Sequence, residues 1–194
     1  MRLSQEQYDK IKHILPVQRG NVTIDNLTLI NALLYILENG APRCLWSFKK
    51  SGVQSIGRSK GGLTTKIHLV SSDAKTAVDF TLSGGQAHDA PQGRNLLDVI
   101  GKQKTVVSLI MDKGYEDDYT RYIAQTLNFN PTVPPKSNRK NLWSYDKELY
   151  KRRNEIERFF RLIKGFRRIF TRYEKLDSML IGFIQLALVF VVIR

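Results

Sequence analysis

The segment "TKIHLVSSDAKTAVDFTLSGGQAHDAPQGRNLLDVIGKQKTVVSLIMDKGY", residues 65–115, decides the fold class. Apolar and polar residues alternate over 65–72 and again over 76–85, which is the period of strands, so the two runs predict a hairpin. Residues 88–102 follow with a helical pattern, and the β-branched run 105–115 is typical of a buried central strand. A hairpin followed by a helix and a further strand predicts an α/β or α+β domain.

Downstream of this segment the alternation of helix and strand continues. Residues 116–128 have a helical pattern, 129–135 form a short strand ended by prolines, and a long basic helix and an apolar helix follow. We therefore assign residues 58–194 to one α/β core. The apolar run 179–193 is shorter than the roughly 18–20 residues that span a bilayer, which favours a buried helix and no membrane partner.

Upstream, residues 1–42 form a small helical N-terminal region. Ser4 and Gln7 have the spacing of a capping box, and a second helix over about 25–38 ends at an Asn-Gly pair. Two short helices joined by a turn fit a small DNA-binding unit, or simply a packed helical region. Residues 43–57 form an irregular junction. Gly, Ser and Lys are frequent from this junction to residue 62, and neither a helical nor a strand period is visible there.

Positive charge is the strongest feature of the composition. The 194 residues carry a net charge of +13, and 136–175 alone contain 14 Lys/Arg against 5 Asp/Glu. A basic segment of this density favours a polyanionic partner, with nucleic acid before an anionic membrane and a solvated basic surface as the plain alternative. The single cysteine, Cys44, excludes a disulfide within the chain and fits a reducing, cytoplasmic compartment.

Two acidic residues stand in positions that favour chemistry. Asp112 follows the strand run, and ligands gather at the carboxyl ends of strands in α/β sheets; the alternative is a turn-closing aspartate. Glu157 lies in a predicted helix over 150–164, beside its apolar stripe, whereas Glu155 faces solvent. Glu157 suits a Mg²⁺ ligand and equally suits an ordinary i,i+4 ion pair with Arg153.

The spacing of Tyr150, Arg153, Glu157 and Lys164 resembles the signature around the last carboxylate of DDE transposases from bacterial insertion sequences, of the insertion-sequence-5-type group. Further strings resemble the same group in the same order along most of the chain. They are "GRSKGGLTTKIH" (57–68), "GGQAHDA" (84–90), "MDKGYEDD" (111–118), "PPKSNRK" (134–140), "RRNEIERFFRLIKGFRRIFTRYEKL" (152–176) and "FIQLALV" (183–189).

The resemblance implies a ribonuclease-H-like core, a mixed sheet flanked by helices, that cuts and joins DNA ends. In an intact family member three acids hold two Mg²⁺ (or Mn²⁺) ions around the scissile phosphate. Asp112 and Glu157 resemble the second and third acids, as catalytic residues and metal ligands. The expected DNA contacts are Tyr150 (by stacking or a phosphate hydrogen bond, with core packing as the alternative), Arg153, Lys164, Arg58, Lys60, Lys136 and Arg168.

The chain departs from the family at the first aspartate, which should precede the string at 57–68. Between Asp25 and Asp73 the only acidic residue is Glu38, in the helical N-terminal region. The simplest interpretation is an internal deletion of the first core strand, which would leave a sheet edge uncovered. Asp25, Asp73 or Asp89 could substitute, but their contexts do not match, and Asp89 resembles a helix N-terminal residue supporting the site.

Three functions follow as hypotheses. The first is a transposase of a bacterial insertion sequence, degenerate in this copy, acting on element ends and target DNA, compatible with a homodimer and with a nucleoid location. The second is a non-catalytic DNA-binding remnant of such a transposase. The third, a generic nucleic-acid-binding protein, would need aromatic stacking positions on an exposed sheet, and the sequence offers no clear set. None of them needs a small-molecule substrate.

Overall fold

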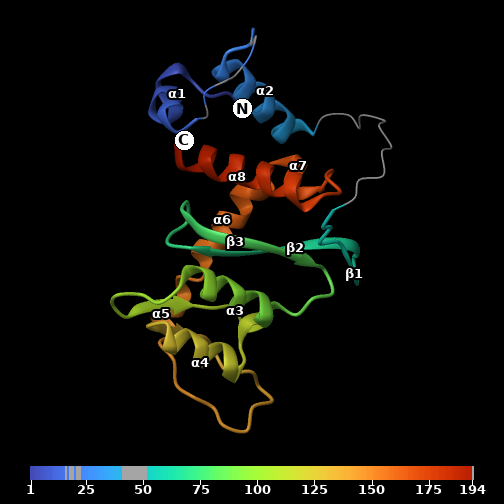
Figure 1. The fold of residues 1–194 in the computed structure, drawn as a ribbon. Helices are drawn as coiled ribbons and strands as arrows, with labels where there is room; N and C mark the ends of the chain where they lie inside the picture. Colours follow the sequence, from blue (N-terminus) through green and yellow to red (C-terminus); the bar gives the residue numbers. More distant parts are fainter. Residues whose placement is uncertain (16, 18–19, 21–22, 41–51, 194) are drawn as a thin grey trace. The chain divides into compact units, whose positions relative to one another are not determined.

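The computed structural model describes residues 1–15, 17, 20, 23–40 and 52–193. These form two compact units, one from Met1–Gln54 with Phe160–Arg194 and the other from Ser55–Phe159 (Figure 1). Most of the predicted junction 43–57, with Cys44, lies outside the described residues.

The first unit is helical. Its elements are α1 (Gln5–Ile11), a 3₁₀ turn (Lys12–Ile14), α2 (Asn26–Asn39), α7 (Arg167–Phe170) and α8 (Asp177–Ile193). The predicted capping box is confirmed, because Ser4 Oγ accepts from Gln7 N–H while the Gln7 side chain accepts from Ser4 N–H. The second predicted helix is confirmed as α2, which Asp25 caps at its start.

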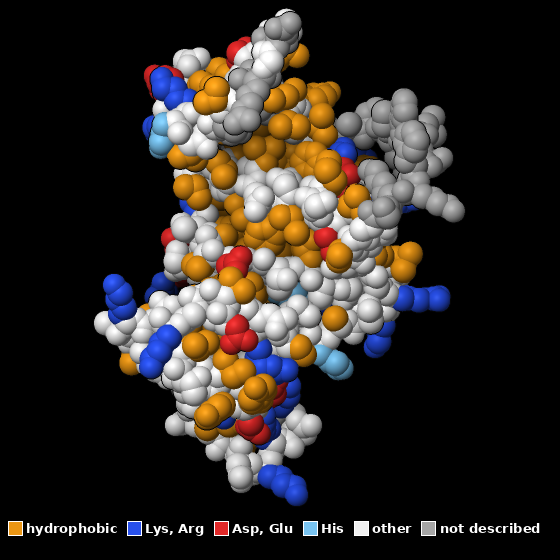
Figure 2. Space-filling model, in the orientation of Figure 1, with side chains coloured by type: hydrophobic (Ala, Val, Ile, Leu, Met, Phe, Trp, Pro, Cys, Tyr) orange, Lys and Arg blue, Asp and Glu red, His pale blue; other side chains and the backbone are white. Residues whose placement is uncertain are grey.

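The core of the first unit joins the two ends of the chain. α2 packs against α7 and α8, and α8 buries a run of apolar side chains, as predicted for the apolar terminal segment. Among the described residues no helix is long and apolar enough to cross a membrane. Hydrophobic side chains also gather on the surface of this unit (Figure 2), where Leu29, Tyr35 and Val192 are exposed.

The second unit contains all the strands of the described residues. Its elements are β1 (Gly57–Ser59), β2 (Gly62–Ser71), β3 (Ala77–Gly84), α3 (Asp89–Ile100), β4 (Val107–Ile110), the 3₁₀ helix η2 (Lys113–Tyr115), α4 (Asp118–Thr126), β5 (Phe129–Thr132), α5 (Lys147–Lys151) and the start of α6 (Asn154–Lys164). The chain is therefore a mixed α/β protein, and the predicted hairpin over 65–85 is confirmed as β2–β3, with a turn held by Asp73.

The strands form two sheets rather than one mixed sheet. β1, β2 and β3 make an antiparallel sheet in that order, whereas β4 and β5 make a separate parallel pair. β1 lies in a stretch that the sequence assigned to a loop. It was missed because Gly57–Ser59 is too short to alternate, and it pairs through a tight turn, with Ser59 opposite Gly62.

The prediction of a buried central strand at 105–115 was wrong. β4 pairs only with β5 among the described residues, so its other edge has no strand partner there. Val106 is 74% exposed and Val107 41% exposed, whereas Leu109 packs against the cluster that α3 and α4 form with β5. A β-branched run signals a strand, but its burial depends on neighbours that lie elsewhere in the sequence.

The basic segment 150–164 is not one helix. α5 ends at Lys151 and α6 begins at Asn154, and Arg153 N–H donates to the Tyr150 carbonyl three residues back rather than four. This tighter, 3₁₀-type turn falls at Arg152 and Arg153, between the two helices. The predicted exposure of the two glutamates was also wrong, because the side chain of Glu155 is 31% exposed and that of Glu157 is 42% exposed, so Glu155 is the less exposed of the two.

Candidate functional site

Asp112 and Glu157, 45 positions apart in the chain, share one cation. The side chain of Arg153 places Nη2 2.8 Å from Glu157 Oε1 and Nη1 3.8 Å from Asp112 Oδ2. Asp112 follows β4 and Glu157 lies in the first turn of α6, so a strand end and a helix start build this site. The structure thus brings together the two acids that the sequence singled out.

Asp112 also closes a turn, as the alternative interpretation of the sequence expected. Its Oδ1 accepts a hydrogen bond of 2.7 Å from Lys113 N–H and caps η2, which begins at that residue. The other oxygen, Oδ2, is the one that faces Arg153. The structure thus confirms the turn-closing aspartate, and its role as a metal ligand stays a prediction.

Tyr150 lies at the same site. The Arg153 guanidinium is 5.9 Å from the centre of its ring, and Tyr145 packs edge-to-face against it with ring centres 5.6 Å apart. Burial raises the pKa of the Tyr150 hydroxyl, Arg153 lowers it, and Asp112 and Glu157 raise it further. The contacts of Arg153 with the ring and with both carboxylates place Tyr150 beside the two acids.

A buried polar network holds the loop that follows Asp112. His68 on β2 is 2% exposed, and its Nδ1 is 2.8 Å from the Tyr115 hydroxyl while Nε2 is 2.7 Å from Ser83 Oγ. Lys66 donates to Asp89 Oδ1 at 2.8 Å, which anchors the start of α3 as expected for Asp89. Sequence reasoning missed His68, because the alternation over 65–72 puts it on the strand face opposite to Ile67 and Leu69.

Gly114, in the middle of η2, is required by close approach. A Cβ at this position would lie 2.6 Å from Asp89 Oδ2, so any side chain would force the Asp89 carboxylate or η2 to shift. Because Asp112 caps η2, the packing of η2 on α3 fixes the position of the aspartate.

We expect the stability of the protein to fall below about pH 6.5 because of His68. Burial lowers the pKa of His68; nearby Asp89 raises it somewhat and Lys66 lowers it. A depressed histidine pKa means that the unfolded chain binds the proton more readily, so this stability is present above pH 6.5 and is lost as the pH falls. Denaturant midpoints measured between pH 8 and 5.5 should fall steeply in the wild type and less in His68→Gln.

His13 provides the control for this prediction. It is exposed, so His13→Gln should keep the wild-type slope of stability against pH. The carboxyl groups Asp25, Asp73 and Asp117 have pKa values below their ordinary 3.8, so their effect belongs to a more acidic range. An unchanged slope in His68→Gln would contradict the prediction.

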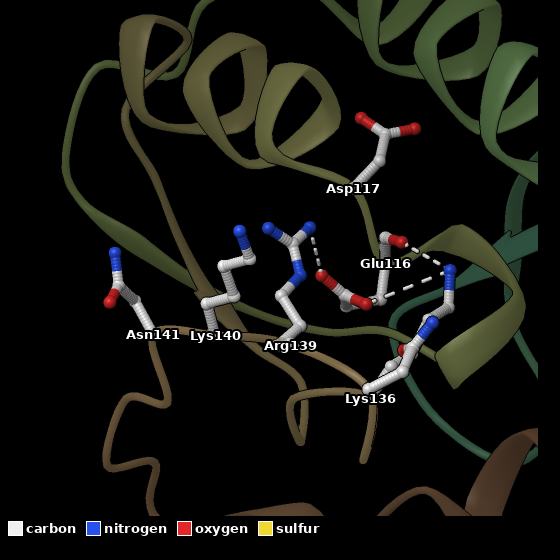
Figure 3. A pocket seen from close by; sticks show the side chains of 7 residues that line it. Glu116, Asp117, Lys136, Arg139, Lys140 and Asn141 are labelled. Carbon is white, nitrogen blue, oxygen red and sulfur yellow. Dashed lines mark hydrogen bonds and ion pairs between the residues drawn. The ribbon is translucent and has the colours of Figure 1, made fainter.

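A second acidic side chain, Glu116, is completely buried beside a cavity of about 470 Å³ (Figure 3). Arg139 Nη2 lies 2.6 Å from its Oε1 and Lys136 Nζ 3.6 Å from its Oε2. Neither carboxylate oxygen has a partner with good hydrogen-bond geometry in the described part of the chain, so the attraction is mainly ionic. Lys136 Nζ also donates to the backbone carbonyl of Glu116 at 2.7 Å.

Three of the seven expected DNA contacts are therefore engaged within the protein, since Arg153 is paired with Glu157. Lys136 is bound to Glu116, although its side chain is 47% exposed. Arg168 is 16% exposed, forms an ion pair with Glu174 and lies 4.7 Å from the centre of the Phe183 ring.

The other expected contacts, and Arg153 with them, differ in exposure. Arg58 and Lys60 are exposed at the hairpin between β1 and β2, and Lys164 is exposed at the last residue of α6. Arg153 is 30% exposed, and Tyr150 is half-buried against Tyr145.

The donor set of the site does not fit a pair of metal ions. No group of three or more His, Cys, Asp or Glu side chains that could hold an ion occurs in the described residues. The residues outside that description contain no Asp, Glu or His, so they supply no third acid. Two carboxylates bridged by a guanidinium remain, where two ions would need three acids.

Comparisons with known proteins give one consistent result. A model of the transposase DDE domain family matches residues 40–192. A protein of Brucella ovis named "Putative transposase for insertion sequence element IS6501" is 32% identical over 133 residues, which is 68% of this chain and all of that protein. No solved structure matches the chain.

Proposed function

We propose that this chain, which belongs to the transposase DDE domain family, is a DNA-binding insertion-sequence transposase that is degenerate in this copy. The observation that carries the proposal is the site itself: Asp112 and Glu157 share Arg153, and no third acid joins them in the described residues. DNA strand cleavage and transfer is the reaction of the family from which this copy descends, and DNA binding is the function that this copy retains.

The proposal includes the loss of the first core strand with its aspartate. The separation of the two sheets and the open edge of β4, with Val106 and Val107 exposed, support it, because a strand between the sheets would cover such an edge. In an intact relative three acids would hold two Mg²⁺ or Mn²⁺ ions that polarise the phosphate. The residues of this chain do not complete that set.

DNA would be held through its phosphates at the exposed cations. We assign this role to Arg58 and Lys60 at the β1–β2 hairpin and to Lys164 on α6. Tyr150 adds a ring or hydroxyl contact. Three further candidates, Lys136, Arg153 and Arg168, are each held by a carboxylate, so a phosphate would have to compete with that partner.

The affinity for duplex DNA should depend steeply on salt. For about six phosphate contacts, counterion release predicts a loss of about 10³-fold between 50 and 200 mM salt. Substituting Arg58 and Lys60 together by glutamine should lower the slope of log affinity against log salt by about 2. The measurement is a fluorescence-anisotropy titration with element-end duplex and with an unrelated duplex.

The matched control is Lys102→Gln with Lys104→Gln, which removes the same charge from two exposed lysines after α3 that are not expected DNA contacts. A salt-independent affinity, or an equal effect of the two double variants, would contradict the assignment. The same complexes, incubated with Mg²⁺ or Mn²⁺, provide a second readout. We expect no cleaved or joined product, and products that Glu157→Gln abolishes would show that the copy is active.

A further inference from the structure

We infer that Arg153 is the built-in cation of the Asp112–Glu157 pair and that it keeps divalent metal ions from binding between the two carboxylates. This inference does not depend on DNA binding, because it concerns only the interaction of three side chains of the second unit.

The first argument is geometric. The guanidinium approaches one carboxylate with each of its terminal nitrogens, Glu157 Oε1 at 2.8 Å and Asp112 Oδ2 at 3.8 Å. The second of these acids lies on a different element, at the end of β4. An i,i+4 ion pair would involve Glu157 alone. The additional contact to Asp112 makes Arg153 a bridge between the two elements that build the site.

The neighbouring arginine shows the contrast. Arg152 is 59% exposed and pairs through Nε with Glu155 at 3.0 Å, three residues along the chain. Arg153 is 30% exposed and lies over the half-buried ring of Tyr150. Arg153 thus contacts two acids and an aromatic ring, whereas Arg152 pairs with one acid. The acids of both arginines are partly exposed, Glu155 at 31%, Glu157 at 42% and Asp112 at 59%.

The second argument is electrostatic. An arginine stays charged at all ordinary pH values, and its planar fork can serve two carboxylates at once. Its charge offsets one of the two negative charges that would attract a divalent ion. An ion between the acids would lie a few ångströms from a permanent positive charge, and this repulsion weakens its binding while Arg153 stays in place.

The test is a Mn²⁺ titration of the purified full chain, with free Mn²⁺ measured by its electron paramagnetic resonance signal. The wild type should bind Mn²⁺ at this site only weakly, with a dissociation constant above about 1 mM. Glu157→Gln should therefore not remove any tighter site from the wild type. Arg153→Gln should bind Mn²⁺ at least about tenfold more tightly than the wild type, because a like charge within 4–6 Å is gone. Adding Glu157→Gln to Arg153→Gln should abolish the gain.

Arg152→Gln is the matched control, since it removes the same charge one residue away and leaves the bridge intact. Its affinity for Mn²⁺ should equal that of the wild type. The inference is overturned if the wild type binds as tightly as Arg153→Gln, or if Arg152→Gln gains as much. Circular dichroism shows whether Arg153→Gln folds, and if it does not, Arg153→Lys replaces it in the titration. Arg153→Lys keeps the positive charge but loses the planar fork, so it should bind Mn²⁺ with intermediate affinity. A wild-type affinity in Arg153→Lys would then count against the bridge.

Discussion

Phe159→Ala should lower the free energy of unfolding by about 3–5 kcal/mol, the largest change that we expect from a single substitution. The side chain is completely buried, two residues after Glu157 on α6. Truncation removes its ring from apolar surroundings and leaves a cavity that a close-packed interior fills only partly. Denaturant unfolding followed by circular dichroism measures the change, and a constant slope against denaturant would show that the unfolded state is unaffected.

Phe170→Ala is the control for this substitution. Its side chain is 68% exposed at the end of α7, so the same truncation should change the free energy of unfolding by less than about 0.5 kcal/mol. Similar losses in the two variants would show that burial does not govern the effect.

Glu116→Ala should lower the free energy of unfolding by about 3 kcal/mol. The carboxylate is completely buried, and its removal leaves a cavity and deprives Lys136 and Arg139 of their counter-charge. Because these two cations are 47% and 24% exposed, water can solvate them in part, which keeps the loss toward the lower end for a broken buried pair. Thermal and denaturant unfolding measure the change.

Two further variants separate the causes. Glu116→Gln keeps nearly the whole side-chain volume but removes the charge, so the part of the loss that it reproduces is ionic. Glu148→Ala truncates a glutamate that is 81% exposed and paired with Lys151, and it should change the stability by less than about 0.5 kcal/mol. A Glu116→Ala variant as stable as Glu148→Ala would contradict the importance of the buried pair.

The local elements of the fold could be predicted because their signals are local. The capping box at Ser4, the end of α2 before Gly40 and the β2–β3 hairpin each depend on residues only a few positions apart. The joining of strands into sheets could not be predicted in the same way. Which strand covers β4 depends on long-range pairing, and β-branched residues such as Val106 signal a strand whether or not a neighbour is present.

The candidate site divides in the same manner. Asp112 and Glu157 were found from the end of a strand run and the family spacing, and the structure brings them together at Arg153. The helical phase used for Glu157 assumed one helix over 150–164, which the structure divides into α5 and α6. Glu116 gave no such signal. It stands in a run of acidic residues that usually faces solvent, and its burial depends on two cations from a loop 20 or more residues later in the chain. His68 was missed for a similar reason, because its partners come from β3 and η2.

The contacts of α3 have a consequence for a chain of this kind that loses a strand. This one helix touches β2, β3, η2 and α4, so it ties both sheets of the second unit to a common support. The position of Asp112 therefore rests on α3, through the packing of η2 on this helix. Under the proposed loss of the first core strand, α3 would still hold this acid in place, so a chain with two of the three acids expected of the family would keep their arrangement.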